Sequence, residues 1–241
     1  MEKSEVLAHI RAIGVVPVLR LSSSSDVLDM ADALHSAHID VVEIPLDMPE
    51  ALLVISTLVQ RFDEKVLVGA GSIVDAESAS NVIAAGASFV TSPSCDAEIV
   101  KYCNATDLAV FPGALTATEI AAAWKAGADM VKVFPCSALG GPSYVETIKT
   151  ALPQVDLFPS GGVTLQNAAS YIDAGASVLG VGRDLVDLTA LREGRLDRIA
   201  ERARLFIELV RDARGDTPTP PPATVSTSRH EGPAQVGQRE R

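Results

Sequence analysis

Ala126-Gly127-Ala128-Asp129-Met130-Val131 is one of three similar stretches in this chain. The others are Ala85-Gly86-Ala87-Ser88-Phe89-Val90 and Ala174-Gly175-Ala176-Ser177-Val178-Leu179, and Ser36-Ala37-His38-Ile39-Asp40-Val41-Val42 is a degenerate copy without the glycine. Each full copy follows an alanine-rich segment, places glycine where a helix end favours a left-handed residue, and then enters a short apolar run. The repeat therefore predicts a helix-to-strand junction. Strands that alternate with helices form parallel sheets with right-handed crossovers.

Eight short apolar segments are predicted as strands. They are residues 15–20, 41–44, 66–69, 89–91, 108–111, 130–134, 156–158 and 178–181. A helix over residues 4–13 is expected before the first strand. Eight equivalent units favour a single closed (β/α)8 barrel, the TIM barrel, and an open doubly wound sheet is the alternative. We expect the barrel domain to span residues 1–214.

The composition changes after Arg214. Gly215-Asp216-Thr217-Pro218-Thr219-Pro220-Pro221-Pro222 opens a segment rich in proline, serine, threonine and other polar residues that runs to Arg241. Such a segment has too few apolar groups to offset the entropy lost on ordering. We therefore predict a disordered tail over residues 215–241, and a functional tail is the alternative.

Composition excludes several classes of protein. The 241-residue chain is 47% hydrophobic and only 4% aromatic, so small aliphatic side chains must build its core. Its net charge of −11 argues against a nucleic-acid partner, because phosphate backbones attract basic patches. The chain has no apolar run of membrane-spanning length, no signal-peptide pattern, and no zinc or disulfide spacing among its cysteines and histidines. We expect a soluble, metal-free, cytoplasmic protein that does not bind membranes.

Lys132 is the most informative single residue. It stands within Met130-Val131-Lys132-Val133-Phe134, which is otherwise typical of a buried strand. A charged ammonium is costly to desolvate, so a lysine in this setting needs a reason. Desolvation favours the neutral amine, which can attack a ketone and form a Schiff base. The alternative is a strand-end lysine whose stem packs while its head reaches water.

Glu43 is a second charged residue inside an apolar strand, Val41-Val42-Glu43-Ile44-Pro45. Burial and a neighbouring cation act in opposite directions on the ionisation of a carboxyl group, and this balance tunes a general acid/base. The alternative is a structural ion pair. Both interpretations predict a cation beside Glu43, and Lys132 is the candidate.

In a (β/α)8 barrel the active site lies at the carboxyl ends of the strands. Polar or glycine residues end nearly every predicted strand of this chain. They are Arg20, Glu43, Gly69-Ala70-Gly71-Ser72, Thr91-Ser92-Pro93, Lys132, Pro159-Ser160-Gly161-Gly162-Val163 and Gly180-Val181-Gly182-Arg183. We expect these residues to converge on one active site.

Two glycine-bearing strand ends, Gly161-Gly162 and Gly180-Val181-Gly182, follow the seventh and eighth predicted strands. Loops at these positions are the usual phosphate cradle of the barrel, because backbone N–H groups and a short helix N-terminus bind the anion. Arg183 could add a bidentate contact. Tight turns also require glycine, so it is the position of these glycines in the barrel that predicts a phosphate site.

The chain resembles the 2-keto-3-deoxy-6-phosphogluconate and 6-phosphogalactonate aldolase family, a class I group that includes 4-hydroxy-2-oxoglutarate aldolase. The resemblance covers roughly residues 15–185, and its motifs match in order and spacing. They are Val42-Glu43-Ile44-Pro45-Leu46, Val68-Gly69-Ala70-Gly71-Ser72, Thr91-Ser92-Pro93, Phe111-Pro112-Gly113 with Thr116-Ala117-Thr118-Glu119, Val131-Lys132-Val133-Phe134-Pro135, and Gly161-Gly162-Val163.

The resemblance implies roles for individual residues. Lys132 is expected to be the Schiff-base lysine and Glu43 the general acid/base. The Ser72 hydroxyl and the segment around Pro93 are expected to hold the pyruvate moiety, and Phe134 to line the substrate site. No metal or organic cofactor is implied, because the protonated imine nitrogen is the electron sink. Family members are typically homotrimers, so we expect a homotrimer here.

Three positions depart from the family pattern. Ser72 stands where threonine is frequent, which keeps the hydroxyl. Asp47 stands four residues after Glu43, where many phosphogluconate enzymes carry an arginine. An acid cannot bind a substrate carboxylate, so Arg20 is the candidate to supply the missing charge. Arg183 replaces a common serine near the phosphate, and either strengthens phosphate binding or indicates a different anionic group.

The sequence thus predicts a lyase that cleaves 2-keto-3-deoxy-6-phosphogluconate, or its galactonate epimer, to pyruvate and glyceraldehyde 3-phosphate. Two alternatives remain. A 4-hydroxy-2-oxoglutarate aldolase would use the same lysine to form pyruvate and glyoxylate, with no phosphate to bind. A non-catalytic phosphosugar-binding barrel would keep Lys132 only as an ion-pair partner.

Overall fold

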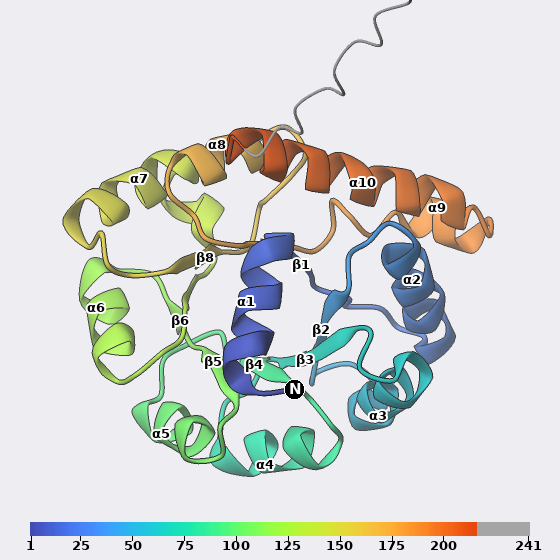
Figure 1. Ribbon diagram of the computed structural model, residues 1–241, viewed down its shortest axis with the longest axis horizontal. Coiled ribbons are helices and arrows are strands. Elements are labelled where there is room, and N and C mark those ends of the chain that lie inside the picture. The colour runs from blue at the N-terminus through green and yellow to red at the C-terminus, as the bar shows by residue number, and fades with distance from the viewer. Residues whose placement is uncertain (216–241) are drawn as a thin grey trace, which may run out of the picture.

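The computed structural model describes residues 1–215. Parallel strands form a ring at the centre of the molecule, and helices cover the ring from outside (Figure 1). The strands are β1 (Val15–Pro17), β2 (Val41–Pro45), β3 (Leu67–Gly71), β4 (Phe89–Thr91), β5 (Ala109–Phe111), β6 (Gly113–Ala114), β7 (Val131–Val133), β8 (Leu157–Pro159) and β9 (Leu179–Val181). Residues 216–241, which hold all but the first residue of the predicted tail, lie outside the described residues.

The strand pairings follow the order of a barrel. Parallel ladders join β2-β3-β4-β5, β6-β7-β8 and β1-β9. β5 and β6 are one barrel strand interrupted at Pro112, which has no N–H to donate. Bridges between Val18 and Glu43 and between Ser160 and Gly180 connect the ends of β1 and β2 and of β8 and β9. The contacts therefore return to β1, as expected for a (β/α)8 TIM barrel and not for an open sheet.

A helix or helical turn follows each barrel strand. The helices are α1 (Lys3–Ile13), α2 (Ser24–Ser36), α3 (Ala51–Phe62), α4 (Ala76–Ala84), α5 (Ala97–Ala105), α6 (Ala117–Lys125), α7 (Pro142–Ala151), α8 (Ala168–Asp173), α9 (Leu188–Arg192), α10 (Leu196–Ala213) and the 3-10 turn η1 (Cys136–Leu139). The predicted helix at 4–13 is α1. Among residues 1–215, no helix is both long enough and apolar enough to cross a membrane.

The repeated junction has the expected backbone geometry. Gly86, Gly127 and Gly175 have φ values of 93°, 100° and 93°, in the left-handed region that glycine enters without a steric cost. In the degenerate copy, His38 adopts the same region with a φ of 64°. These four αβ junctions therefore share one left-handed turn, although only three of them have glycine at the turn position.

Aromatic side chains fill the barrel interior. Phe89, Phe111 and Phe158 are fully buried, and their successive ring centroids are 5.5 and 5.9 Å apart. Gly69 makes room for this cluster, because a Cβ at that position would lie 2.2 Å from the Phe89 ring. The barrel is thus a packed core and not a channel.

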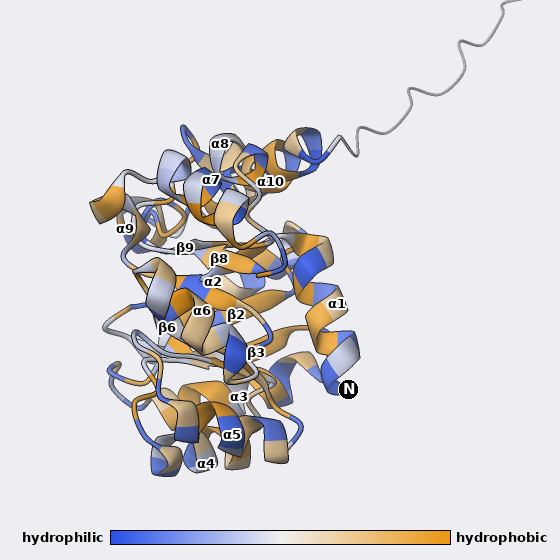
Figure 2. Cartoon of the chain, turned by 90° about the vertical axis from the view of Figure 1, so that its left-hand side faces the viewer, coloured by the Kyte–Doolittle hydropathy of each residue, from blue (hydrophilic) through white to orange (hydrophobic). Residues whose placement is uncertain are grey.

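Helix α1 covers one end of the barrel, as Figures 1 and 2 show. Lys3 forms an ion pair of 2.9 Å with Asp129, and Arg11 forms one of 2.9 Å with Asp156. Both acids precede strands, β7 and β8, so α1 closes the amino-terminal ends of the strands. The carboxyl ends, where Lys132 and Glu43 are expected to act, lie at the other end of the ring.

Candidate active site

Three side chains meet inside the barrel near the carboxyl ends of the strands. Nζ of Lys132 lies 2.9 Å from Oε1 and 3.2 Å from Oε2 of Glu43, and 2.8 Å from Oγ1 of Thr91. The residues are 6%, 2% and 0% exposed, respectively. They come from β7, β2 and β4, which are the sixth, second and fourth strands of the barrel. Alternate strands build one layer of side chains in this fold, so the trio occupies such a layer.

The surroundings of Lys132 are otherwise apolar. The Phe134 and Phe158 rings lie with their centroids 6.0 and 5.8 Å from Nζ. A buried ammonium or carboxylate is tolerated only when it is paired, and the contact with Glu43 meets that requirement. The strand-end alternative, with the lysine head in water, does not describe this side chain. The predicted cation beside Glu43 is Lys132.

Gly71 provides the space for the Glu43 carboxylate. The two residues lie on the paired strands β3 and β2, and a Cβ on Gly71 would lie 2.3 Å from Oε1 of Glu43. Real side chains never approach so closely, so only glycine is compatible with this position of the carboxylate. The Gly-Ala-Gly-Ser motif therefore has a packing role directly beside the ion pair.

A second polar group, formed by Arg20, Asp47 and Ser72, involves the loops after β1, β2 and β3. The Arg20 guanidinium forms an ion pair with Asp47, and Oγ of Ser72 lies 3.4 Å from Oδ1 of the same carboxylate. The Arg20 and Asp47 side chains are 58% and 51% exposed. Two predicted substrate-binding residues are thus joined by Asp47, which the sequence indicated only as a departure from the family pattern.

The loops after β7 and β8 pack closely against each other. Gly161 and Gly162 have φ values of 82° and 97°, and the amide of Ser137 donates to the carbonyl of Gly161 over 3.1 Å. A Cβ on Gly161 would lie 3.2 Å from the Phe134 ring, and one on Gly162 would lie 2.4 Å from Cβ of Ser137. Among residues 1–215, the N–H group of Gly162 has no hydrogen-bond acceptor, whereas that of Gly161 faces Gly180 in the bridge between Ser160 and Gly180. The N–H group of Gly162 is available to an anion.

The remaining predicted residues, Pro93, Gly182 and Arg183, have no side-chain hydrogen bond to the ion pair within residues 1–215. Pro93 is exposed, and the backbone of Gly113 packs against it, because a Cβ there would lie 2.3 Å from the Pro93 carbonyl carbon. Gly182 is half-buried, whereas Arg183 is exposed and has no hydrogen-bond or ion-pair partner within the described part of the chain. No hydrogen bond connects Gly182 or Arg183 to the Lys132–Glu43 pair.

Cys136 follows Lys132 by four residues but does not have the environment of a nucleophile. It is fully buried, and its Sγ lies 3.8 Å from the carbonyl oxygen of Gly141. Burial raises the pKa of the Cys136 thiol. The protonated thiol is the less reactive form, so Cys136 has a packing role.

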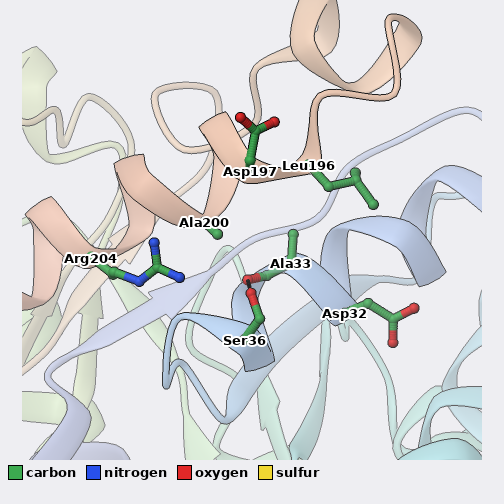
Figure 3. Close-up of a pocket in the computed structure, with 7 residues that line it drawn as sticks. All are labelled: Asp32, Ala33, Ser36, Leu196, Asp197, Ala200 and Arg204. Atoms are coloured by element: carbon green, nitrogen blue, oxygen red, sulfur yellow. Dashed lines mark hydrogen bonds between the residues drawn. The ribbon is translucent and has the colours of Figure 1, made fainter.

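Residues outside this region offer less chemistry. A surface pocket of about 340 Å³ lies between α2 and α10, with Asp32, Ser36, Leu196, Asp197 and Arg204 among its lining residues (Figure 3). None of the predicted site residues lines it. Among residues 1–215, no group of three or more histidine, cysteine, aspartate or glutamate residues could hold a metal ion.

Thr91 is the residue of the buried trio for which the sequence predicted no individual role, although it was among the strand-end residues expected to converge on the site. Threonine is common in strands, so its occurrence after Phe89-Val90 is no signal. The only available hint was its place at a predicted strand end, next to Ser92-Pro93. Asp47 was visible as an acid, but its contact with Arg20 depends on loops whose conformations the sequence does not specify.

Comparison with known proteins places this chain in a family. Residues 6–202 match the family model described as KDPG and KHG aldolase. The chain belongs to this family. Members of the KDPG and KHG aldolase family are lyases that cleave carbon–carbon bonds; KDPG is 2-keto-3-deoxy-6-phosphogluconate, and KHG is 4-hydroxy-2-oxoglutarate.

Individual relatives support this membership. The chain is 34% identical over 201 residues to the 2-dehydro-3-deoxy-6-phosphogalactonate aldolase of Escherichia coli (strain K12), covering 83% of this chain and 95% of that protein. It is 30% identical over 209 residues to the 2-dehydro-3-deoxy-phosphogluconate aldolase of Pseudomonas aeruginosa, covering 80% and 93%. A solved KDPG aldolase from Legionella pneumophila, with pyruvate captured as a covalent carbinolamine, superposes with a TM-score of 0.76 at 28% identity, over 82% of this chain and 96% of that one.

Proposed function

We propose that this chain is a class I aldolase that cleaves a 2-keto-3-deoxy-6-phospho sugar acid, the gluconate or galactonate epimer, to pyruvate and glyceraldehyde 3-phosphate. The observation that carries the proposal is the burial of Lys132, whose Nζ contacts both carboxylate oxygens of Glu43. An amine in apolar surroundings beside a carboxylate has what imine chemistry requires: a nucleophile and a group that moves protons.

The proposed reaction begins when neutral Lys132 attacks the C2 ketone through Nζ. Loss of water from the carbinolamine gives an iminium. Glu43, through a water, takes the proton of the C4 hydroxyl, the C3–C4 bond breaks, and its electrons move into the iminium to form an enamine. Glyceraldehyde 3-phosphate leaves. Protonation of the enamine and hydrolysis then release pyruvate and restore the lysine.

The two ends of the substrate are proposed to bind different loops. Arg20 and Ser72 would hold the carboxylate, with the pyruvate moiety between Phe134 and the segment around Pro93. The free N–H group of Gly162, with the backbone at Gly161 and the loop at Gly182, would cradle the phosphate. This division uses local donors, as an acidic chain must when it captures a substrate with two anionic groups.

Arg183 is proposed to add a phosphate contact, because its guanidinium is exposed and unpaired within residues 1–215. The test compares kcat/KM for the phosphorylated substrate and for 4-hydroxy-2-oxoglutarate, in the wild type and in Arg183→Ala. We expect only the phosphorylated substrate to lose efficiency. Equal effects on both substrates, with 4-hydroxy-2-oxoglutarate the better one, would instead favour cleavage to pyruvate and glyoxylate.

The roles of Lys132 and Glu43 are tested by separating imine formation from turnover. Lys132→Ala should abolish cleavage, and near-wild-type cleavage by this variant would contradict the mechanism. Glu43→Gln should lose turnover and still form the imine with pyruvate. Parallel loss of imine formation and turnover in Glu43→Gln would indicate a structural role for this carboxylate.

We further propose that the barrel domain spans residues 1–214 and assembles as a homotrimer in the cytoplasm. Apolar side chains that are largely exposed in the single chain, Leu53 at 60% and Val74 at 59%, support an oligomer. Free cysteines Cys95, Cys103 and Cys136 fit a reducing compartment. Light scattering on the eluted protein should give three chain masses, and a monomer mass would contradict the trimer.

A further inference from the structure

Thr91 has an unusual environment for a threonine. Its side chain is fully buried, and within residues 1–215 its hydroxyl forms a hydrogen bond only with Nζ of Lys132. At 2.8 Å, this is the shortest of the three contacts of Nζ. A buried hydroxyl is costly unless it is paired, and the partner of this one is the amine of Lys132.

The backbone fixes this hydroxyl in place. Thr91 ends β4 and pairs with Phe111 of β5, and its carbonyl accepts from the amide of Ile73 over 3.2 Å. A β-branched side chain on a strand has few rotamers, so Oγ1 has little freedom to leave Nζ. The contact is therefore preorganised and does not depend on a mobile loop.

We propose that Thr91 is a further catalytic residue of this site, whose hydroxyl orients the amine of Lys132 for attack on the ketone. The proposal rests on the proposed function, in which Lys132 forms the imine. A neutral amine has two N–H groups and one lone pair. When one N–H is donated to Glu43 and the other to Thr91, the lone pair is directed away from both partners.

This geometry matters at the step that forms the C–N bond. The Nζ lone pair bonds to C2, the π electrons of the C2 carbonyl move to its oxygen, and one Nζ proton ends on that oxygen to give the neutral carbinolamine. Without the hydroxyl, an amine held by Glu43 alone can rotate about its Cε–Nζ bond. Attack then requires a rarer orientation, which slows bond formation. Thr91 thus acts on imine formation, whereas Glu43 acts on cleavage of the C3–C4 bond.

The test uses variants that differ in one group. Thr91→Val removes the hydroxyl and keeps the branched shape, and Thr91→Ser keeps the hydroxyl. Thr57→Val is the control, because within residues 1–215 the Thr57 hydroxyl bonds only the Leu53 carbonyl on α3, outside the site. The readout is the rate at which pyruvate and borohydride label Lys132, followed by mass, with thermal unfolding measured in parallel.

We expect Thr91→Val to slow labelling roughly fivefold, which corresponds to about 1 kcal/mol, the usual contribution of one hydrogen bond. Thr91→Ser should restore most of the rate, and Thr57→Val should match the wild type. If Thr91→Val fails to fold, the pair Thr91→Ala and Thr91→Ser, which differ only in the hydroxyl, gives the same comparison.

Two results would overturn the proposal while leaving the aldolase assignment intact. One is a wild-type labelling rate in folded Thr91→Val. The other is equal rates in Thr91→Ser and Thr91→Ala. The absence of any label on Lys132 in the wild-type protein is a different result, since it would remove the proposed function together with the role of Thr91.

Discussion

At the scale of single residues, the chemistry depends on what each side chain touches inside the barrel. Lys132 and Glu43 could be predicted from the sequence, because charged residues inside apolar strands are rare and must be paired. Thr91 was expected near the site as a strand-end residue, but its contact with Lys132 could not be predicted, since threonine is an ordinary strand residue. The contact of Arg20 with Asp47 was equally hidden, because two separate loops create it.

Gly71 gives the first prediction at this scale. Gly71→Ala places a methyl group 2.3 Å from the present position of Oε1 of Glu43, so the carboxylate must move away from Lys132. We expect cleavage to fall about a hundredfold, the usual effect of a displacement of about 1 Å in an active site. The control is Gly194→Ala between α9 and α10, whose Cβ would meet no atom of residues 1–215 within 4 Å; its φ of 67° adds backbone strain but no contact with the site. Steady-state kinetics that left Gly71→Ala unimpaired would contradict the geometry of the ion pair.

Arg20 gives the second prediction at the residue scale. Arg20→Ala removes the cation proposed to hold the substrate carboxylate, and hydrogen bonds to charged groups contribute about 1.5–3 kcal/mol. We therefore expect KM to rise roughly tenfold or more, with a smaller change in kcat. Arg61→Ala is a matched control, because Arg61 also forms an exposed ion pair, with Asp32, outside the site. An unchanged KM in Arg20→Ala would assign the carboxylate to another group.

At the scale of elements, the sequence predicted the order of strands and missed details that depend on single backbone groups. The fifth strand was predicted over 108–111, but it continues beyond Pro112 as β6, since proline removes only one donor from the ladder. The first strand was predicted to reach residue 20, whereas regular pairing ends at Pro17. A repeat without its glycine still forms its turn, because His38 accepts the left-handed conformation.

The start of α6 offers a prediction for one element. The Thr116 hydroxyl accepts from the amide of Glu119, and the Glu119 carboxylate accepts from the amide of Thr116, a reciprocal cap on the helix after β6. Thr116→Ala should destabilise the protein by about 1 kcal/mol, the usual cost of losing an N-cap. Thr118→Ala, two residues further along the same helix, should cost less. Urea unfolding measures both, and equal effects would contradict the cap.

At the scale of the whole molecule, α1 covers the amino-terminal ends of the barrel strands. The proposed active site lies at the opposite end, where the strands have their carboxyl ends. A net charge of −11 surrounds a site proposed to bind anions, so binding must rely on a few local donors. The sequence predicted this architecture from the number and order of its units. Residues 216–241 and the assembly of several chains are not described by the structure, so the predicted tail and trimer stay predictions.

Stability at alkaline pH is a prediction for the molecule as a whole. Burial raises the pKa of Cys103 to about 11, above the value of about 8.5 for an unfolded thiol. A raised folded-state pKa contributes stability that is fully present below pH 8.5 and is lost as the pH rises towards 11. Unfolding free energies should therefore fall over this window, and less steeply in Cys103→Ala. Identical slopes would contradict a buried, protonated Cys103.

The central claim is that Lys132 forms an imine with a 2-keto acid. The most direct measurement is borohydride reduction of the whole protein with pyruvate, followed by intact-mass analysis and peptide mapping. We expect one reduced pyruvyl group per chain, on Lys132, and none in Lys132→Ala. A folded wild-type protein that carried no adduct on any lysine would contradict the account and would leave the phosphosugar-binding barrel as the better description.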